Sequence, residues 1–430
     1  MTTLLSGAVG LVVGTVWLAR LGALGVQRGE FLAAYALVCV AYLVALRAVG
    51  RLGRLTTRRV LVLVGLVAIV CRLSALALPE SDDVYRYLWE GRLQHHGGNP
   101  YVVSPIEART AFPEIAEHDP YLPRVNHPDL TTIYPPLAEL VFRAATAVSY
   151  RVTAWKLWML GMELLLVLLL AARLRASGRP SEDLLAYAWH PLPILAFAGE
   201  GHMDVLMLLA LWVAIHGVLS GRSAFAGAGF ASAIGSKLIP VIYLPAFGRR
   251  LGPRGWGVAL AVALLPTLVY LDAGWGLVRI AFRFGREMAH NSGSYLLLSR
   301  LVGEERAPLL ALVLFTVFWF ASRTWFRREE GSERMVQGML HLTGAFLLLA
   351  PTLHPWYLTW LVPFFVVRRP LGWVALSLTG GLAYLAYGYL AETGVFHLPA
   401  GWVALEFGLP AAAVLVAVLA RRVQGTVRLS

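Results

Sequence analysis

The stretch Ser81-Asp82-Asp83-Val84-Tyr85-Arg86-Tyr87-Leu88-Trp89-Glu90-Gly91-Arg92 places two adjacent carboxylates directly before aromatic and basic residues. It follows an apolar run at 60–78 that is long enough to form a membrane helix. Residues 79–133 form the longest polar segment and hold nine of the 25 Asp and Glu residues. Paired acids just outside a membrane helix, at the start of a large loop, indicate a reaction centre at a membrane surface.

The composition is that of a membrane protein. Of the 430 residues, 58% are hydrophobic and only 14% are charged. The predicted spans are 3–19, 31–49, 60–78, 155–172, 184–199, 203–219, 256–272, 307–325, 336–352, 371–389 and 402–420, with a shorter span at 356–367 broken by Pro363. We therefore expect an all-α polytopic membrane protein with about 12 transmembrane helices, in a single integral membrane domain over 1–430.

The formal net charge of +12 is distributed in a way that favours a membrane and not a nucleic acid as the partner. Arginines gather in short loops, at 47–59, 173–179, 222, 249–254, 323–334, 368–369 and 421–428. All of these loops fall on one side if the N-terminus is cytoplasmic, which is the positive-inside pattern. Both termini are therefore expected in the cytoplasm and the acid-rich loop on the outer face, with no nucleic-acid partner.

Two outer loops are predicted. Residues 79–136 form the first, an extracytoplasmic active-site loop, and an amphipathic helix that begins near Pro135 continues it to 149 in the outer interface. The aromatic residues of this loop favour an ordered structure over a disordered one. Residues 273–306 form the second outer loop.

Asp82 and Asp83 suit two different roles. A carboxylate at a lipid–water boundary can act as a general base that removes the proton of an attacking hydroxyl. Partial desolvation would raise its pKa toward a useful range. The alternative is that both acids cap a helix that begins at Val84 and interact with its dipole. Residue type alone favours neither the catalytic role nor the capping role.

Lys237 lies in the middle of an apolar run, 224–247, that is interrupted by glycine and proline and flanked by basic loops. A re-entrant-like hairpin of two half-length helices, with Lys237 at its tip, keeps both basic loops inside. A buried ammonium needs an anionic partner. A phosphate leaving group is the favoured partner, and a structural ion pair with a buried acid such as Asp204 is the alternative.

A basic stripe is predicted in the second outer loop, because Arg279, Arg283, Arg286 and His290 recur at helical spacing. Such a basic helix face can bind a lipid phosphate. Side chains that snorkel to the interface explain the same pattern equally well.

Polar motifs also mark the ends of two spans. They are Gly199-Glu200-Gly201-His202-Met203-Asp204 and His354-Pro355-Trp356-Tyr357, both expected at the outer face. Hydrogen bonds to sugar hydroxyls or to phosphate are the favoured role of His202, Asp204 and His354. A divalent metal site is the less favoured alternative. We therefore assign no metal ligand and predict no cofactor firmly.

These residues resemble motifs of the GT-C superfamily, the polytopic glycosyltransferases that use polyprenyl-phosphate sugars on the outer membrane face. The resemblance covers most of residues 60–370. The segments that carry it are Asp83-Val84-Tyr85-Arg86-Tyr87-Leu88-Trp89-Glu90-Gly91-Arg92, Gly98-Asn99-Pro100-Tyr101, Asn126-His127-Pro128, Ile133-Tyr134-Pro135-Pro136, Gly201-His202-Met203-Asp204 and Ser236-Lys237. They are most similar to bacterial mannosyltransferase-like members.

The resemblance implies a role for each matched residue. Asp83 would be the catalytic base with Asp82 in reserve, and Lys237 would contact the donor phosphate, aided by Arg283, Arg286 and His290. The expected substrate contacts are Tyr85, Arg86, His127, Tyr134, His202, Asp204, His354 and Tyr357. The chain departs from its relatives at His354-Pro355-Trp356-Tyr357, where they have an arginine before the tyrosine.

The expected function is therefore transfer of a hexose, with mannose as the expected sugar, to a glycan or glycolipid hydroxyl at the outer face of a bacterial cytoplasmic membrane. Its partners would be a polyprenyl-phosphate lipid and the acceptor. A transporter or flippase of a lipid-linked or anionic substrate is the first alternative, although no internal repeat is visible. A non-catalytic membrane scaffold is the second. Glycan polymerases and ligases remain alternatives within the same chemistry.

Overall fold

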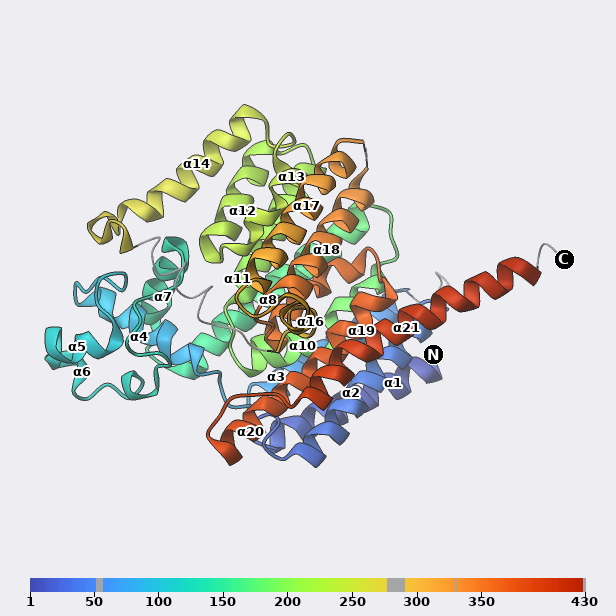
Figure 1. Ribbon diagram of the computed structural model, residues 1–430, viewed down its shortest axis with the longest axis horizontal. Helices are drawn as coiled ribbons and strands as arrows, with labels where there is room; N and C mark the ends of the chain where they lie inside the picture. The colour runs from blue at the N-terminus through green and yellow to red at the C-terminus, as the bar shows by residue number, and fades with distance from the viewer. Residues whose placement is uncertain (52–56, 277–290, 329–330, 428–430) are drawn as a thin grey trace. The chain divides into compact units, whose positions relative to one another are not determined.

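The computed structural model of the chain describes residues 1–51, 57–276, 291–328 and 331–427. Within these residues every regular element is a helix (Figure 1). Six helices are long and apolar enough to cross a membrane, namely Thr2–Arg20, Arg28–Val49, Val152–Ala176, Ala307–Arg327, Leu371–Thr393 and Ala400–Ala420. A seventh span results if the broken pair Pro191–Gly199 and Asp204–Leu219 crosses as one. The chain is a multi-pass membrane protein.

The prediction of an all-helical membrane protein is confirmed, but a count of twelve spans is not. The remaining predicted spans fall on helices that are shorter or more polar than a plain span. Helix α3 (Thr57–Ala75) carries Arg58, Arg59 and Arg72. Helices α11 (Asp204–Leu219), α14 (Gly252–Leu268) and α18 (Ser332–Leu349) have 16, 17 and 18 residues, and α12 (Ser223–Ser236), which lies in the predicted hairpin, has 14.

The chain divides into two compact units. The first consists of 1–78, 177–194 and 289–430, and the second of 79–176 and 195–288. The helices of the first unit are α1 (Thr2–Arg20), α2 (Arg28–Val49), α3, α9 (Leu185–Ala188), α10 (Pro191–Pro193), α16 (Gly293–Val302), α17 (Ala307–Arg328), α18, α19 (Leu371–Thr379), α20 (Leu385–Thr393) and α21 (Ala400–Val427), with 3₁₀ turns at Pro355–Trp360 and Val362–Val366.

Arg72 shows how the first unit holds a charge inside a helix bundle. Its side chain is buried, and Nη1 donates to the carbonyl oxygens of Ala188 at 2.7 Å and Ala68 at 3.2 Å. A guanidinium that binds backbone carbonyls satisfies both groups in an apolar surrounding. Arg72 thereby joins α3 to the neighbouring helix α9.

The second unit contains the candidate catalytic residues of the first outer loop. Its helices are α4 (Asp83–His95), α5 (Pro105–Ala111), α6 (Pro113–Ala116), α7 (Pro136–Val148), α8 (Val152–Ala176), α11, α12, α13 (Leu244–Phe247) and α14, with a π-helical turn η4 at Ile194–Gly199 and 3₁₀ turns η2 (Leu122–Arg124), η5 (Ile239–Tyr243) and η6 (Leu271–Ala273). Helices α4 and α7 pack closely because Gly91 lacks a side chain: a Cβ there would lie 2.5 Å from the Phe142 carbonyl oxygen.

Aromatic rings fill the space between α4, α7 and α8. The ring centroids of Tyr87 and Phe142 lie 4.9 Å apart, and those of Tyr87 and Trp155 lie 5.1 Å apart. Such large buried rings contribute much of the packing energy of a small core. This aromatic core fixes α4, and with it Asp83 at its N-terminus.

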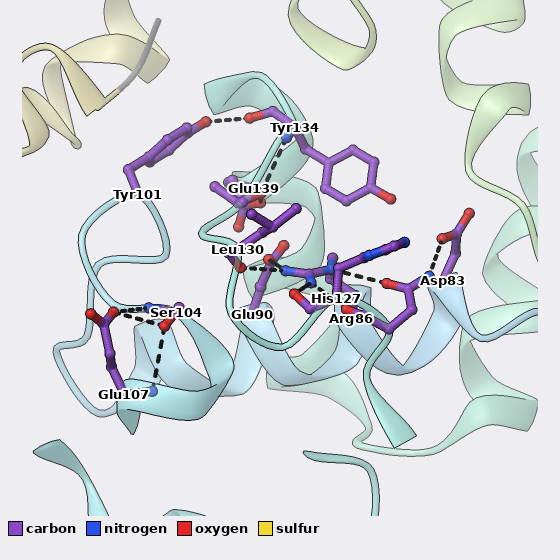
Figure 2. Close-up of polar contacts among 12 residues, drawn as sticks. Asp83, Arg86, Glu90, Tyr101, Ser104, Glu107, His127, Leu130, Tyr134 and Glu139 are labelled. Carbon is purple, nitrogen blue, oxygen red and sulfur yellow. Dashed lines mark hydrogen bonds and ion pairs between the residues drawn. The ribbon is translucent and has the colours of Figure 1, made fainter. Parts of the chain in front are cut away.

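The predicted first outer loop is ordered and packs on α4. Tyr85, Trp89 and Leu93 of α4 form a buried cluster with residues of α5, α6 and η2. Ser104 and Glu107 form a capping box at the start of α5 (Figure 2), in which the Ser104 N–H donates to Glu107 Oε2 at 2.9 Å. Each N-terminal donor that is satisfied in this way stabilises a short helix.

Helix α12 ends at Ser236, and Lys237 follows in extended conformation with φ of −158° and ψ of 137°. The chain continues as η5 and α13, so the helical run is broken at Lys237. Gly227 packs against the backbone of Gly255 in α14, where a Cβ would approach its carbonyl oxygen to 2.0 Å. The membrane placement of 79–136, 224–247 and 273–306 stays a prediction.

Candidate active site

Asp83 is the first residue of α4, and two side chains contact its carboxylate. The Asn126 amide Nδ2 donates to Oδ1 at 3.0 Å, and His202 Nδ1 lies 3.6 Å from Oδ2. The side chain of Asp83 is 22% exposed. A carboxylate that is held on both oxygens yet reaches solvent has the geometry of a general base: it is oriented and still accessible to a hydroxyl.

His202 lies in the turn between η4 and α11, and its side chain is fully buried. Its second ring nitrogen, Nε2, lies 3.6 Å from Glu200 Oε2. The imidazole therefore stands between two carboxylates, at distances slightly too long for hydrogen bonds but within reach of an ion pair when the ring is protonated. The His202 side chain is buried in this structure, and its contact with substrate stays a prediction.

Asp82 occupies the N-cap position of α4 but makes no side-chain capping bond. Ser81 takes that role: its hydroxyl accepts the Asp83 N–H at 3.3 Å and donates to Asp82 Oδ1 at 3.3 Å. Asp82 reaches solvent, yet the protein packed around it withdraws part of its hydration. This desolvation, and then the charge of Asp83, raise the pKa of Asp82.

Lys237 forms an ion pair with Asp204, and the Nζ to Oδ1 distance is 2.7 Å. The Asp204 side chain is 1% exposed and that of Lys237 is 22% exposed. The alternative considered for Lys237, a structural ion pair with this acid, is therefore present. Because Asp204 follows His202 by two residues, one short turn joins the surroundings of Asp83 to those of Lys237.

Arg86 is buried one turn after Asp83, and its guanidinium holds the loop that carries Asn126. It donates to the carbonyl oxygens of Asn126 at 2.5 Å, His127 at 2.8 Å and Leu130 at 3.2 Å, and pairs with Glu90 Oε1 at 3.0 Å. Figure 2 shows Arg86 pointing from α4 into this loop. His127 has a φ of 45°, a backbone conformation that residues other than glycine rarely adopt. The Arg86 contact with its carbonyl oxygen helps to maintain it.

A second buried acid, Glu139 of α7, lies beside Glu90. Glu139 accepts hydrogen bonds from Thr132 Oγ1 at 2.7 Å and from Gln94 Nε2 at 2.9 Å. Burial raises the pKa of Glu139 well above its ordinary value, and repulsion from Glu90 adds to this effect. Glu139 is therefore expected to hold a proton, which it can share with Glu90.

The predicted substrate contacts of this unit differ in accessibility. The side chains of Tyr85, Arg86 and Tyr134 are buried in the described structure, and that of His127 is exposed. Tyr85 donates to Glu80 Oε1 at 2.5 Å. Arg86 binds the protein's own backbone in this structure. Contacts of Tyr85, Arg86, His127 and Tyr134 with substrate stay predictions.

His354 and Tyr357 belong to the first unit. The His354 ring stacks on Trp356 with centroids 4.3 Å apart, and Tyr357 stacks on Trp360 at 4.6 Å. Both are part of an aromatic cluster around the 3₁₀ turn at Pro355–Trp360. Arg283, Arg286 and His290 lie outside the described residues.

The divalent-metal alternative stays a prediction. Among the described residues, no three His, Cys, Asp or Glu side chains are arranged to hold a metal ion. In that part of the chain His202 faces Asp83 and Glu200, while Asp204 pairs with Lys237.

Sequence reasoning missed three residues that the structure joins to Asp83 or to its support. Asn126 and Glu200 lie within motifs that were quoted, but neither was assigned a role. Glu90 follows Arg86 by four positions, and this spacing on a helix is the signal that could have identified the pair.

A partly exposed carboxylate next to a buried imidazole, in a chain with several apolar spans, fits a membrane enzyme of the group-transfer type. Residues 6–251, more than half of the chain, match the family described as alpha-(1->6)-mannopyranosyltransferase, N-terminal domain. The chain therefore belongs to this mannosyltransferase family, and it is a bacterial glycosyltransferase of the GT-C type. Searches of curated proteins and of solved structures return no match.

Proposed function

We propose that the chain transfers a hexose, with mannose as the expected sugar, from polyprenyl phosphate to a hydroxyl of a glycan or glycolipid, with inversion, at the outer face of a bacterial cytoplasmic membrane. The observation that carries the proposal is the Asp83 carboxylate, which is oriented by Asn126 at 3.0 Å yet 22% exposed. The family supports the sugar transfer, whereas the donor, the acceptor and the residue roles are proposed here.

In the proposed step the acceptor oxygen bonds to C1 of the sugar while the bond from C1 to the phosphate oxygen breaks. The departing phosphate keeps the electron pair, and the acceptor proton passes to Asp83. The transition state has oxocarbenium character, so charge develops on the leaving phosphate. Lys237 would stabilise that charge, with Arg283, Arg286 and His290 as further candidates.

The experiment uses the purified full chain in detergent, with radiolabelled polyprenyl-phosphate mannose and no transmembrane gradient. Label should pass to the acceptor, whereas a transporter or flippase would leave the donor intact. The substitution Asp83→Asn should lower the transfer rate by at least about 100-fold, the usual contribution of a general base.

Glu117→Gln is the matched control, because it removes an exposed carboxylate from the same loop and should leave transfer unchanged. If Asp83→Asn unfolds at the same temperature as the wild type, the loss of transfer activity comes from the chemical step and not from misfolding. Full activity in Asp83→Asn would refute the assigned base.

A further inference from the structure

Within the described residues, the side chain of Asn126 hydrogen-bonds the Asp83 carboxylate. Its Nδ2 donates to Asp83 Oδ1 at 3.0 Å. The opposite end of the same amide, Oδ1, accepts from Arg86 Nε at 3.3 Å. Because an amide has one donor end and one acceptor end, the Arg86 contact fixes which end faces Asp83.

The loop around Asn126 is held as firmly as its side chain. Arg86 binds the carbonyl oxygens of Asn126 and His127. Glu90, which also belongs to α4, holds the guanidinium through an ion pair of 3.0 Å. Arg86 and Glu90 are both almost fully buried, so this ion pair has little freedom to move. The loop and Asp83 are thus bound to the same helix, and the Asn126 amide closes the connection.

We propose that Asn126 is a positioning residue for the transfer reaction, which holds Asp83 in the one rotamer that meets the acceptor hydroxyl. This rests on the proposed function, in which Asp83 is the base. A donor aimed at Oδ1 fixes the plane of the carboxylate and favours its ionised form. His202 supports the other side at 3.6 Å, and the shorter contact with Asn126 sets the orientation.

Two substitutions separate orientation of Asp83 from packing of the loop. Asn126→Ala removes the contacts of the amide with Asp83 and Arg86, together with its hydrogen bond to Asp82. Asn126→Asp keeps an acceptor for Arg86 but replaces the donor with a second carboxylate facing Asp83. The other groups near Asp83 that titrate or carry charge are Asp82 and Tyr87 on α4, Tyr134 before α7, and His202 with Glu200 in the turn before α11.

The readout is the pH profile of kcat/KM together with kcat and the donor KM. Asn126→Ala should lower kcat about tenfold and move the acid limb up by about one pH unit, because the ionised base loses a donor. Asn126→Asp should move the acid limb further, because two adjacent carboxylates repel. The donor KM should stay within about twofold, because neither variant alters Lys237.

Asn99→Asp is the matched control. The Asn99 amide also donates to a carboxylate, Asp272 Oδ1, at 2.7 Å in the same loop, but that acid is not the base. This variant should keep the wild-type kcat and acid limb. A purely structural role of Asn126 would lower the amount of folded protein and leave the acid limb of the remainder unmoved, which would overturn the proposal.

The outcomes of the two proposals are distinguishable. Wild-type kcat and an unmoved acid limb in both Asn126 variants would end the positioning role and leave the base intact. Transfer by Asp83→Asn at the wild-type rate would end the proposed function, and the positioning role with it.

Discussion

Asp82 and Asp83 are chemically identical neighbours, and their contacts distinguish them. Asp83 is bound by Asn126, which lies 43 positions away in the chain, and faces His202 of a more distant turn. Asp82 shares the Asn126 amide but also contacts the adjacent Ser81, and it is the more exposed of the two acids. The position of the acidic pair at the start of a helix could be predicted from the sequence. The long-range contacts of Asp83 could not, because they join residues that are far apart in the chain.

Lys237 has two candidate partners, and a double substitution separates them. Lys237→Met alone removes the ammonium that pairs with the buried Asp204, which should destabilise the protein by about 3 to 5 kcal/mol. Adding Asp204→Asn removes that buried charge and should restore the temperature of thermal unfolding. If Lys237 also holds the donor phosphate, the donor KM of the double variant should stay raised at least about tenfold.

Asp204→Asn alone is the control for the double substitution, because it removes the acid and retains the ammonium. It should bind donor at least as well as wild type. A double variant that recovers both stability and the wild-type donor KM would contradict the phosphate role and leave Lys237 as a structural residue.

Helices α4 and α7 bury a pair of carboxyls between them, so their packing should depend on pH. The folded-state pKa of Glu139 is raised well above 4.5, chiefly by burial. Stability from its protonated form is fully present below the unfolded pKa and is lost as pH rises through the raised folded pKa. Glu139→Gln should therefore flatten the fall in unfolding temperature between about pH 5 and pH 9.

The measurement is thermal unfolding of the full chain in detergent, followed by tryptophan fluorescence across that pH range. Glu117→Gln, on the exposed side of the loop, should retain the wild-type slope. An equally steep slope in Glu139→Gln would show that Glu139 is not the group responsible.

The start of α7 was predictable, whereas its buried face was not. Pro135 and Pro136 mark the N-terminus as expected. Helical spacing puts Glu139, Arg143 and Thr146 on one polar side of this helix, yet Glu139 and Thr146 are buried while Arg143 is exposed. A helical pattern treats polar residues as outward-facing, but partners from α4 such as Gln94 and His95 satisfy them inside.

Over the whole molecule, composition and apolar runs were sufficient to predict a multi-pass helical protein. The span count was less predictable, because α11, α12 and α14 are shorter than a plain span and one run is broken between η4 and α11. Hydropathy cannot distinguish a short buried helix from a crossing one. The packing of these short helices, such as that of Gly227 on Gly255, depends on tertiary structure.

The proposed orientation follows from the arginine loops and can be tested by cysteine labelling. Cys39 and Cys71 are first replaced by alanine. A cysteine at Glu114, in the first loop, should then react with a membrane-impermeant maleimide in intact cells. A cysteine at Arg175, beyond α8, should react only after the membrane is permeabilised. The reverse pattern would place the proposed active site on the cytoplasmic face.

The most direct test of the central claim is the single-turnover rate of sugar transfer by Asp83→Asn at saturating polyprenyl-phosphate mannose. Saturation removes donor binding from the measurement, so the rate reports the chemical step. We predict a fall of at least about 100-fold with donor affinity unchanged. Transfer at the wild-type rate would contradict Asp83 as the base.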